Sequence, residues 1–455
     1  MKATYIPTKN PCPETIGVAP EILAACLARY SRSKDGIDAI LAESAGKSPD
    51  AIFKFIDYGH ASIGGLTGGI AIAVDGVSML LAYKLFEFAQ MADGQESSTR
   101  YIQFDRSGIP NPDEIGIPKH LQSTWQKTLE AGLNLYHGAR ITLENKIANN
   151  PEAARLPAAA LQKEQVKARM LKNYALDRSR YFLPFACKTS LAIVATARIW
   201  ADTLKQLESL QWPEAISAAA LIRTELSKVS PNLIRHSHPD NASVASAWGL
   251  LQNGQFELAT TYEFLGGIEP CQCRLAVLGE PSQFNNLRTD MKSVFRGKSN
   301  RYSHVGAAIK RQTVQAEWSA VAIAELRDLN RHRTGYRFSD FLPQGFYFPQ
   351  ETADALAECG QVAALTEYLM GYSTLVRELA RQGAPGIHAY GFALGTQVAF
   401  EHTQQADKFL YEVELRTGLG AHFRYAEHLK QAAELYFEKF PETRGFVQIG
   451  TAEPE

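Results

Sequence analysis

The sequence predicts an α+β protein built from two similar domains, which we place at residues 1–235 and 236–455. A chain of 455 residues is longer than one ordinary core requires, because domains typically hold ~100–200 residues. Apolar residues recur at helical spacing over most of the chain, and a few short apolar runs have the character of buried strands. The order of these segments in the second half loosely repeats the order in the first half, although direct identity between the halves is weak.

Composition and charge exclude several classes of protein. Hydrophobic residues make up 45% and charged residues 21% of the chain, as in soluble globular proteins. The formal net charge of −1 provides no general attraction to nucleic acid or to an anionic membrane. The longest apolar run, residues 68–83, is interrupted by Asp75 and falls short of the ~20 apolar residues that a spanning helix needs. Six scattered cysteines and an N-terminus without a signal-peptide apolar region favour a reducing cytoplasm.

The first half is expected to begin with helices and to contain one clear buried strand. Taken in order, its segments are helix, strand, helix, extended chain and two largely helical stretches, over residues 14–57, 69–74, 77–91, 96–101, 118–182 and 191–229. Residues 231–273 are rich in His, Asn, Gly and Ser, and we place the domain boundary there. The motifs Cys271-x-Cys273 and His236-x-His238 lack further ligands, so no metal site is expected.

The second half follows a similar plan. A segment with some strand character leads into a helix that ends near Arg331, and an extended stretch over residues 338–349 comes next. Helices are predicted over about residues 354–382, and two more over about residues 400–440. The helix of residues 77–91 takes the place of the one over 320–331, and the helix of residues 200–207 takes the place of 409–416.

Chemistry-bearing side chains gather in one short motif in each half. Arg331-His332-Arg333 places three cationic or titratable groups at the predicted end of a helix, where they either complement the helix dipole or hold a phosphate or a flavin edge. Glu96, Ser98 and Arg100 alternate along an extended segment, a pattern also typical of an exposed polar edge. The motifs alone do not decide between these interpretations.

Taken together, the motifs resemble the signature of the flavin-dependent thymidylate synthase family. That signature joins Arg-His-Arg to a downstream Glu-x-Ser-x-Arg-Tyr within one subunit, whereas here it is split. The first half keeps Glu96-x-Ser98-x-Arg100-Tyr101 but has Phe88-Ala89-Gln90 in place of the triplet, and the second half keeps only the triplet. Further segments resemble the flavin loop, a nucleotide-binding arginine and the arginine that polarises the pyrimidine: Gly59-His60-x-Ser62, Arg180-x-x-Leu183-Pro184 and Leu415-Arg416.

Four segments depart from the family pattern, among them Gln405-x-Asp407, which keeps neither residue of an Asn-x-Arg pair. Gly64-Gly65 replaces an acidic residue of the flavin loop, and Thr196-x-Arg198 keeps only the arginine of an Asn-x-Arg pair. Asp328 stands where a glutamine usually contacts the nucleotide. Arg178 lies two residues before Arg180 and is an alternative candidate for the same role.

The resemblance implies a role for each group of residues. The cofactor would be FAD, held by His60, Ser62, Arg198, Arg331, His332 and Arg333. The substrate would be held by Glu96, Ser98, Arg100, Arg180 and Arg416. Arg416 would stabilise negative charge on the pyrimidine and Ser98 would position it, so we assign catalysis to these two residues.

Because the two halves keep complementary parts of the signature, we expect one composite site per chain. The family's site lies between subunits of a homotetramer, so the chain would form an intramolecular pseudo-dimer and then a homodimer. The implied reaction is methylation of dUMP to dTMP with methylenetetrahydrofolate and NADPH. Two alternatives stay open, namely alkylation of another pyrimidine nucleotide and a non-catalytic flavin- or nucleotide-binding protein.

Overall fold

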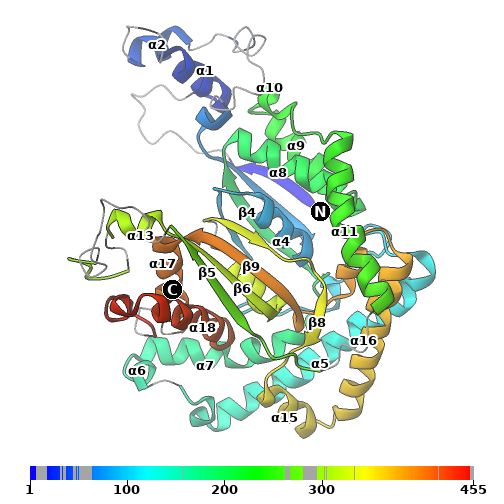
Figure 1. The fold of residues 1–455 in the computed structure, drawn as a ribbon. Helices are drawn as coiled ribbons and strands as arrows, with labels where there is room; N and C mark the ends of the chain where they lie inside the picture. The colour runs from blue at the N-terminus through cyan, green and yellow to red at the C-terminus, as the bar shows by residue number, and fades with distance from the viewer. Residues whose placement is uncertain are drawn as a thin grey trace. The chain divides into compact units, whose positions relative to one another are not determined.

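The computed structural model has the predicted α+β composition (Figure 1). It describes residues 1–6, 18–30, 33, 37–44, 48, 50, 64–156, 158–261, 267–279, 295–301, 303, 305–332, 334–418 and 420–450. The predictions for His60, Ser62 and Arg333 lie outside these residues. Within the described part of the chain, none of the helices combines the length and the apolar character needed to cross a membrane.

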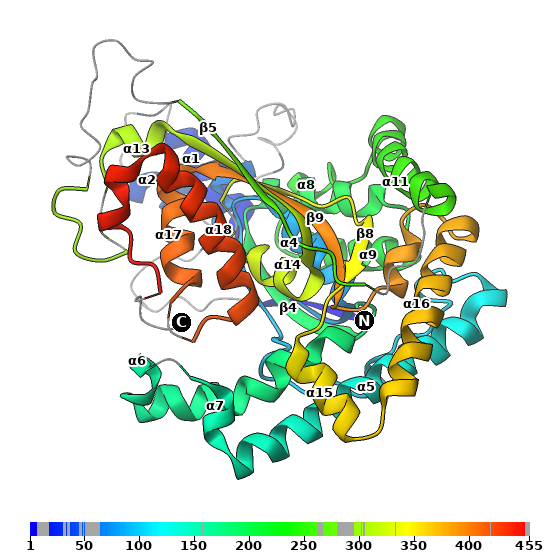
Figure 2. The ribbon, with the colours of Figure 1, turned by 60° about the horizontal axis from the view of Figure 1, so that its bottom comes forward.

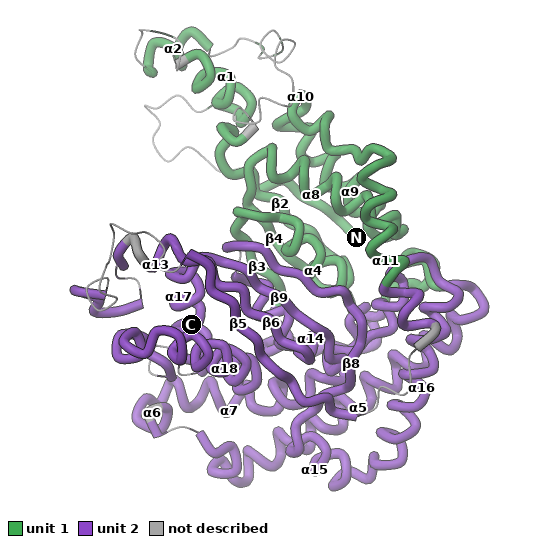
Figure 3. Tube along the Cα trace, in the orientation of Figure 1, with its two compact units in different colours: residues 1–97, 110–117, 187–253 green, residues 98–109, 118–186, 254–455 purple. Residues whose placement is uncertain are grey.

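The chain divides into two compact units, each assembled from separate stretches of sequence (Figure 3). Unit 1 comprises Met1–Ser97, Pro110–Ile117 and Cys187–Asn253, and unit 2 comprises Ser98–Ile109, Pro118–Ala186 and Gly254–Glu455. The boundary that the sequence suggests at residue 235 separates two halves that resemble one another, whereas the compact units are groups of segments that pack together. The boundary at residue 235 stays a prediction.

Unit 1 is built on a four-stranded antiparallel sheet in the order β1-β2-β4-β3. Its strands are β1 (Lys2–Ile6), β2 (Ile70–Ser78), β3 (Asp93–Glu96) and β4 (Lys188–Ala195). Its helices are α1 (Pro20–Tyr30), α2 (Ile37–Ser44), α4 (Met79–Phe88), α8 (Ala197–Ser209), α9 (Pro213–Ser227) and α10 (Pro231–Ile234). Helix α11 (Asn241–Thr261) begins in this unit and occupies the region that the sequence indicated as a boundary.

Strand β2 runs directly into α4, and Ser78 fixes this switch. The Ser78 hydroxyl oxygen accepts a hydrogen bond from the Leu81 amide at 2.9 Å, as an N-cap does. The Ser78 amide and hydroxyl in turn donate to the two carboxylate oxygens of buried Glu214, each at 2.7 Å. The predicted strand and the helix after it are therefore both confirmed.

Unit 2 is built on a second antiparallel sheet in the order β5-β6-β9-β7, with β8 also pairing with β9. The strands are β5 (Cys273–Leu278), β6 (Thr313–Ala322), β7 (Tyr336–Phe338), β8 (Pro343–Phe346) and β9 (Thr396–Gln405). As in unit 1, its long strands run directly into helices, since β6 leads into α14 (Ile323–Leu329) and β9 leads into α17 (Ala406–Arg416).

The remaining helices of unit 2 form two groups. Helices α5 (Gln122–Asn149), α7 (Glu164–Ser179), α15 (Gln350–Glu358) and α16 (Val362–Gln382) pack on one another, with short α6 (Ala158–Leu161) against α7. Helix α17 lies beside α18 (Phe423–Lys439) in both views of the ribbon (Figures 1 and 2). Short α13 (Ala307–Arg311) contacts α17.

Parts of three strands are predicted as helix. Strand β4 runs past Leu191 to Ala195, β9 contains Phe400, and β6 continues to Ala322, beyond residue 320 where the helix is expected to begin. The last three residues of β6 and the first three of β9 are buried in succession, and apolar residues in such a run fit a buried helix as well as a strand, which explains these errors.

Candidate functional site

Among the described residues of unit 2, four arginines singled out by the sequence act on one buried carboxylate, that of Asp328. We call Arg100, Arg180, Arg331 and Arg416, with Asp328, the arginine cluster. Arg180 donates from both terminal nitrogens to Asp328 Oδ2 at 3.1 Å, and Arg331 Nε lies 3.9 Å from Oδ1. Burial alone would raise the pKa of Asp328, but the charges of the four arginines outweigh it and lower that pKa to about 2.

Helix ends position most of the cluster. Asp328 lies in the last turn of α14, Arg331 follows the end of that helix, and Arg416 is the last residue of α17. Arg180 follows α7 directly. The C-terminal end of a helix carries partial negative charge, so it stabilises the charged arginines and destabilises the ionised form of Asp328. The charges of the arginines offset this effect on Asp328.

Helix α14 ends at Leu329, so the predicted end near Arg331 is two residues too late.

Arg100 is held by a second aspartate. Its Nε and Nη2 donate to the two oxygens of Asp177 at 2.7 and 2.9 Å, and Nη2 also donates to the carbonyl oxygen of Gly420 at 3.2 Å. Burial opposes the charge of Arg100, but Asp177 raises the pKa of this guanidinium well above its ordinary value. This is the forked geometry in which a guanidinium binds a carboxylate or a phosphate.

Ser98 shapes the turn that carries Arg100. The amides of Tyr101 and Ile102 donate to the Ser98 carbonyl at 3.1 and 3.0 Å, and the Arg100 amide donates to the Ser98 hydroxyl oxygen at 3.2 Å. Residues 98–102 thus form a turn, and the prediction of an extended segment is wrong here. Serine favours this outcome because its hydroxyl bonds to backbone two residues further on. Glu96 ends β3 and belongs to unit 1.

The structure separates Arg178 from its neighbour Arg180. The Arg178 guanidinium lies 3.6 Å from the centre of the Tyr174 ring and pairs with Glu351 at 3.5 Å. Arg180 is the one that reaches Asp328, so it is the arginine that joins the cluster.

His332 faces inward rather than outward. Its Nε2 accepts a hydrogen bond from Arg416 Nε at 2.6 Å, and the Glu412 carboxylate lies 4.0 Å from the same nitrogen. Burial lowers the pKa of His332 to about 3, so the imidazole is neutral. Burial would raise the pKa of Glu412, but His332 and His402 lower it to about 2. Arg416 therefore donates to a neutral imidazole, and the ionised carboxylate of Glu412 lies next to that imidazole.

A second carboxyl group of α14, Glu325, lies one turn before Asp328. Tyr181 donates its hydroxyl to Glu325 Oε1 at 2.6 Å, while Oε2 has no hydrogen-bond partner among the described residues. Burial raises the pKa of Glu325 to about 7, against the opposing charge of Arg180. The sequence analysis missed Glu325 and Glu412. The available signal was their spacing, three residues before Asp328 and four before Arg416, which places each pair on one helix face.

In unit 1, Arg198 lies beside the glycine loop that the sequence associated with flavin. A Cβ built on Gly65 would come within 3.6 Å of the Arg198 guanidinium carbon. Arg198 is in the first turn of α8, whose N-cap is Thr196. The structure therefore brings the Gly64-Gly65 turn and Arg198 together.

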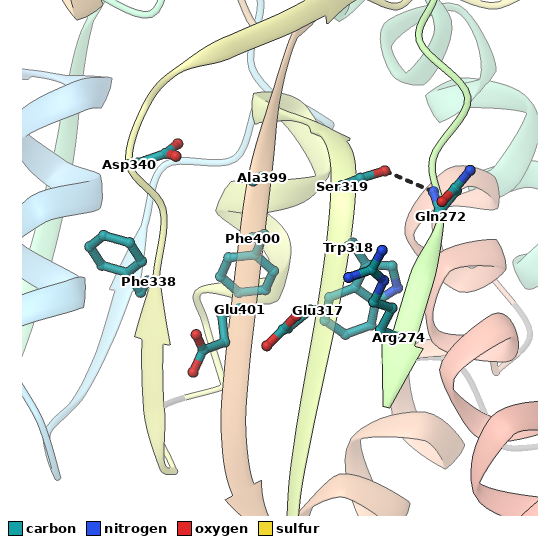
Figure 4. A pocket seen from close by; sticks show the side chains of 10 residues that line it. All are labelled: Gln272, Arg274, Glu317, Trp318, Ser319, Phe338, Asp340, Ala399, Phe400 and Glu401. Atoms are coloured by element: carbon teal, nitrogen blue, oxygen red, sulfur yellow. Dashed lines mark hydrogen bonds between the residues drawn. The ribbon is translucent and has the colours of Figure 1, made fainter. Parts of the chain in front are cut away.

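A cavity of about 450 Å³ opens on the face of the unit 2 sheet (Figure 4). One row of cross-strand neighbours crosses it, in the order Phe338, Glu401, Glu317 and Arg274. Asp340 adds a third carboxylate to its lining. Three carboxylates and one guanidinium do not suit a phosphate, so this cavity is a poorer candidate for a nucleotide than the arginine cluster.

Comparison with known proteins finds relatives for about half of the chain. Residues 17–232 match the family model Thy1, described as thymidylate synthase complementing protein. A flavin-dependent thymidylate synthase of Clostridium tetani is 26% identical over 227 residues, which cover 48% of this chain and 83% of the relative. A UPF0159 protein of Chlamydia muridarum is 26% identical over 251 residues, covering 48% of this chain and 45% of the relative. The match thus spans less than half of that chlamydial protein.

Residues 17–232, just under half of the chain, match the model of this family, and over this segment the resemblance to flavin-dependent thymidylate synthases is confirmed. Among solved structures, a UMP/dUMP methylase, PolB of Streptomyces cacaoi, aligns with 41% of this chain and 100% of its own, at 15% identity and a TM-score of 0.32. Arg100, Arg180 and Arg198 lie inside the segment that matches the family, whereas Arg331, His332 and Arg416 lie beyond it.

Proposed function

We propose that this chain methylates a uridine nucleotide with the help of a bound flavin, at one site centred on the arginine cluster. The observation that carries this proposal is convergence. Arg100 and Arg180 come from the segment that matches the family, Arg331 and Arg416 come from beyond it, and all four act on Asp328. This convergence supports one site to which both parts of the split signature contribute.

The residues of the cluster suit the separate tasks of such a site. Forked guanidinium groups bind the phosphate of a nucleotide, which is the role we assign to Arg100 and Arg180. Arg416, oriented by His332, would stabilise negative charge that develops on the pyrimidine ring. Ser98 supports the turn of Arg100 and so acts in positioning. We keep Glu96 as a substrate-binding candidate from the resemblance alone.

The described residues fit a flavin in part. The Arg331 side chain is 26% exposed and offers a cation to flavin phosphates, and Arg198 adjoins the Gly65 turn in unit 1. His332 does not fit, because its Nε2 already accepts a bond from Arg416. A bound flavin would supply hydride chemistry. By resemblance to the family we propose FAD as that flavin, with methylenetetrahydrofolate and NADPH as carbon donor and reductant.

The wider arrangement follows from the same proposal. The two sheets share one plan of strand order, with β1, β2, β4 and β3 corresponding to β5, β6, β9 and β7. This supports two diverged copies of one domain, forming a pseudo-dimer within the chain and a homodimer in the cytoplasm. The cluster would then be the surviving member of two related sites.

The test is production of dTMP from dUMP by the purified protein, followed by mass spectrometry with methylenetetrahydrofolate and NADPH present. We expect a flavin absorbance spectrum at near one flavin per chain. Arg331→Ala is expected to reduce flavin retention, and Arg416→Ala is expected to retain flavin but to lower turnover by at least about 100-fold. Arg274→Ala, an arginine of unit 2 outside the cluster, is the control.

A protein that neither retains nor rebinds flavin and is not stabilised by dUMP would contradict this proposal. Binding of dUMP and flavin without turnover would instead favour the non-catalytic alternative. Alkylation of another pyrimidine nucleotide is favoured by Asp328, whose carboxylate occupies Arg180.

A further inference from the structure

Glu325 is a fully buried carboxyl group with too few hydrogen-bond partners for a charged one. Its side chain is inaccessible to solvent, Tyr181 donates to Oε1 at 2.6 Å, and Oε2 has no partner among the described residues. None of the described basic side chains forms an ion pair with it. An ionised carboxylate offers about four acceptor sites, and burying a charge with so little compensation is costly. Glu325 therefore binds a proton more readily than an ordinary glutamate.

Charged and titratable groups of several elements of unit 2 act on Glu325. They are Asp328 of α14, Arg180 and Tyr181 after α7, Tyr347 after β8, Arg424 of α18 and Cys271 before β5. Burial is the largest effect and raises the pKa of Glu325 to about 7, against the charges of Arg180 and Arg424. Burial also raises the pKa of Tyr347 and of Cys271, so these two groups are neutral. A modest change in the surrounding charge thus decides whether Glu325 holds a proton near pH 7.

Arg180 connects Glu325 to the proposed nucleotide site. It is the strongest opposite charge acting on Glu325, and it is one of the two arginines that we assign to the phosphate. A phosphate monoester carries about −1.5 to −2 charges near pH 7. Bound at Arg180, it would add negative charge near Glu325 and engage the guanidinium group that favours the ionised form of Glu325. Both effects make the neutral form of this carboxyl group more favourable.

We propose that Glu325 is a further residue of the nucleotide site, which takes up a proton from the solvent when a phosphate monoester binds at Arg180. This inference rests on the proposed function and keeps its substrate class, a pyrimidine nucleoside monophosphate. The proton stays on the Glu325 carboxyl group, so one buried negative charge is removed as the charge of the ligand arrives. In the free protein Glu325 already holds the proton below about pH 7, so binding is strongest there and weakens as the pH rises above this value.

Calorimetric titration with dUMP in two buffers of different ionisation enthalpy counts the protons taken up per nucleotide. At about pH 8 the phosphate is already a dianion and contributes little to the count. Wild type is expected to take up about 0.3 proton or more per nucleotide, and Glu325→Gln close to none. Glu351→Gln, which changes a partly exposed carboxylate of the same unit, should match wild type. Nucleotide binding with the same count in wild type and Glu325→Gln overturns the inference and leaves the proposed function standing.

The same titrations give the pH dependence of affinity. Glu325→Gln is neutral at every pH, so its affinity does not depend on a proton at this position. From about pH 6 to about pH 8, the dissociation constant of wild type is expected to rise about fivefold relative to that of Glu325→Gln. Titration of the dUMP phosphate cancels in this ratio. A ratio that does not change with pH contradicts proton uptake at Glu325.

Sulfate covers the cases in which dUMP does not bind or Glu325→Gln does not fold. It needs no pyrimidine, and it keeps both of its charges over the whole pH range of the test. Wild type is expected to take up a proton with sulfate at about pH 8 but not at about pH 5, where Glu325 already holds one. Burial lowers the pKa of His422 well below its ordinary value, so uptake at this histidine would instead grow toward low pH.

The outcomes with sulfate separate the two proposals. Sulfate binding without uptake at about pH 8, or uptake that grows toward about pH 5, overturns the inference. Uptake with sulfate but no binding of dUMP counts against the proposed function alone. A protein that binds neither anion lacks the anion site that both proposals require, and both are then wrong.

Discussion

The charge of the arginine cluster depends on three carboxylates, those of Asp177, Asp328 and Glu412. The sequence pointed to the arginines of the cluster but not to these carboxylates. The Arg331-His332 pair stands out because runs of cationic side chains are rare at one place in a chain, whereas Arg416 is indicated by the resemblance to the family. Their carboxylate partners come from α7, α14 and α17 and are ordinary acidic residues of helices. Sequence alone could not predict that Asp177 pairs with Arg100 or Asp328 with Arg180, because these pairs depend on tertiary contacts, whereas Glu412 lies four residues before Arg416 on the same helix.

Glu325 provides a prediction about stability and pH. In the folded protein its pKa is raised from 4.5 to about 7, so the folded state keeps a proton that the unfolded chain loses earlier. Stability is therefore lost as the pH rises from about 4.5 through about 7. Glu325→Gln, which stays neutral, is expected to raise the free energy of unfolding at about pH 8 by up to about 3 kcal/mol, with little effect below pH ~5.

Urea unfolding at the two pH values measures this effect. Glu351→Gln, a partly exposed carboxylate of the same unit, is the matched control and should show no such pH-dependent gain. A Glu325→Gln variant whose stability changes by the same amount at both pH values would show that folding does not raise the pKa of Glu325.

His332 provides a prediction about positioning. Because its pKa is lowered from 6.5 to about 3 by burial, the imidazole should stay neutral from about pH 8 to about pH 4, which NMR of the ring can follow. His332→Leu removes the acceptor of Arg416 and is expected to lower kcat by about tenfold or more, with a smaller change in KM. His332→Gln keeps an acceptor and should recover part of the rate. Titration of the ring near pH 6.5, or equal losses in both variants, would contradict this role.

At the scale of elements, the sequence is most informative around the switch from β2 to α4. Strand β2 and helix α4 follow from the apolar run after Gly69 and from the helical spacing beyond Val77. Parts of strands β4, β6 and β9 are predicted as helix because their apolar residues also fit a buried helix. The turn at Ser98 was missed because alternation of polar side chains does not reveal a hydroxyl that bonds to nearby backbone.

The switch from β2 to α4 can be tested with Ser78→Ala. This change removes the N-cap and leaves a buried oxygen of Glu214 without its donor, so we expect a loss of about 2–4 kcal/mol in the free energy of unfolding. Thr196, the N-cap of α8, accepts from the Ile199 amide at 3.5 Å, and Thr196→Ala should cost less, at most about 1 kcal/mol. Urea unfolding measures both variants, and equal losses would contradict the special role of Ser78.

At the scale of the whole chain, the sequence indicated a repeated plan that the two sheets share. Their strand orders correspond, and each sheet sends two strands directly into helices. The match to the family ends at residue 232, so the likeness of the second half depends on this plan and on the residues of the cluster. The interleaving of the two compact units could not be predicted, because it requires residues 118–186 to pack with the second half.

Helices α4 and α14 follow corresponding strands of the two sheets, and the charged residues on them predict how many nucleotides one chain binds. Counted from the first residue of each helix, Lys84 of α4 occupies the place of Asp328 of α14, and Glu87 occupies the place of Arg331. The sequence comparison, which puts Phe88 in the place of Arg331, is therefore one residue out of register. Lys84 pairs with Glu87 at 2.7 Å and both are buried, so α4 carries the same kind of ion pair with its charges reversed. A helix with this reversed pair lacks the guanidinium group that an anion needs. We therefore expect calorimetric titration to give one nucleotide per chain.

Arg100→Gln is the variant that distinguishes one site from two, because Arg100 comes from the first half and acts on a cluster that is completed by the second. If the cluster is the site, this change should weaken nucleotide binding by about 100-fold or more, since the forked contact to phosphate and the pairing of Asp177 are lost together. Arg274→Ala should leave affinity and stoichiometry unchanged. Binding of two nucleotides per chain, or half of the original capacity remaining at full affinity in Arg100→Gln, would show that a second site exists and that the split signature does not mark the only place where nucleotide binds.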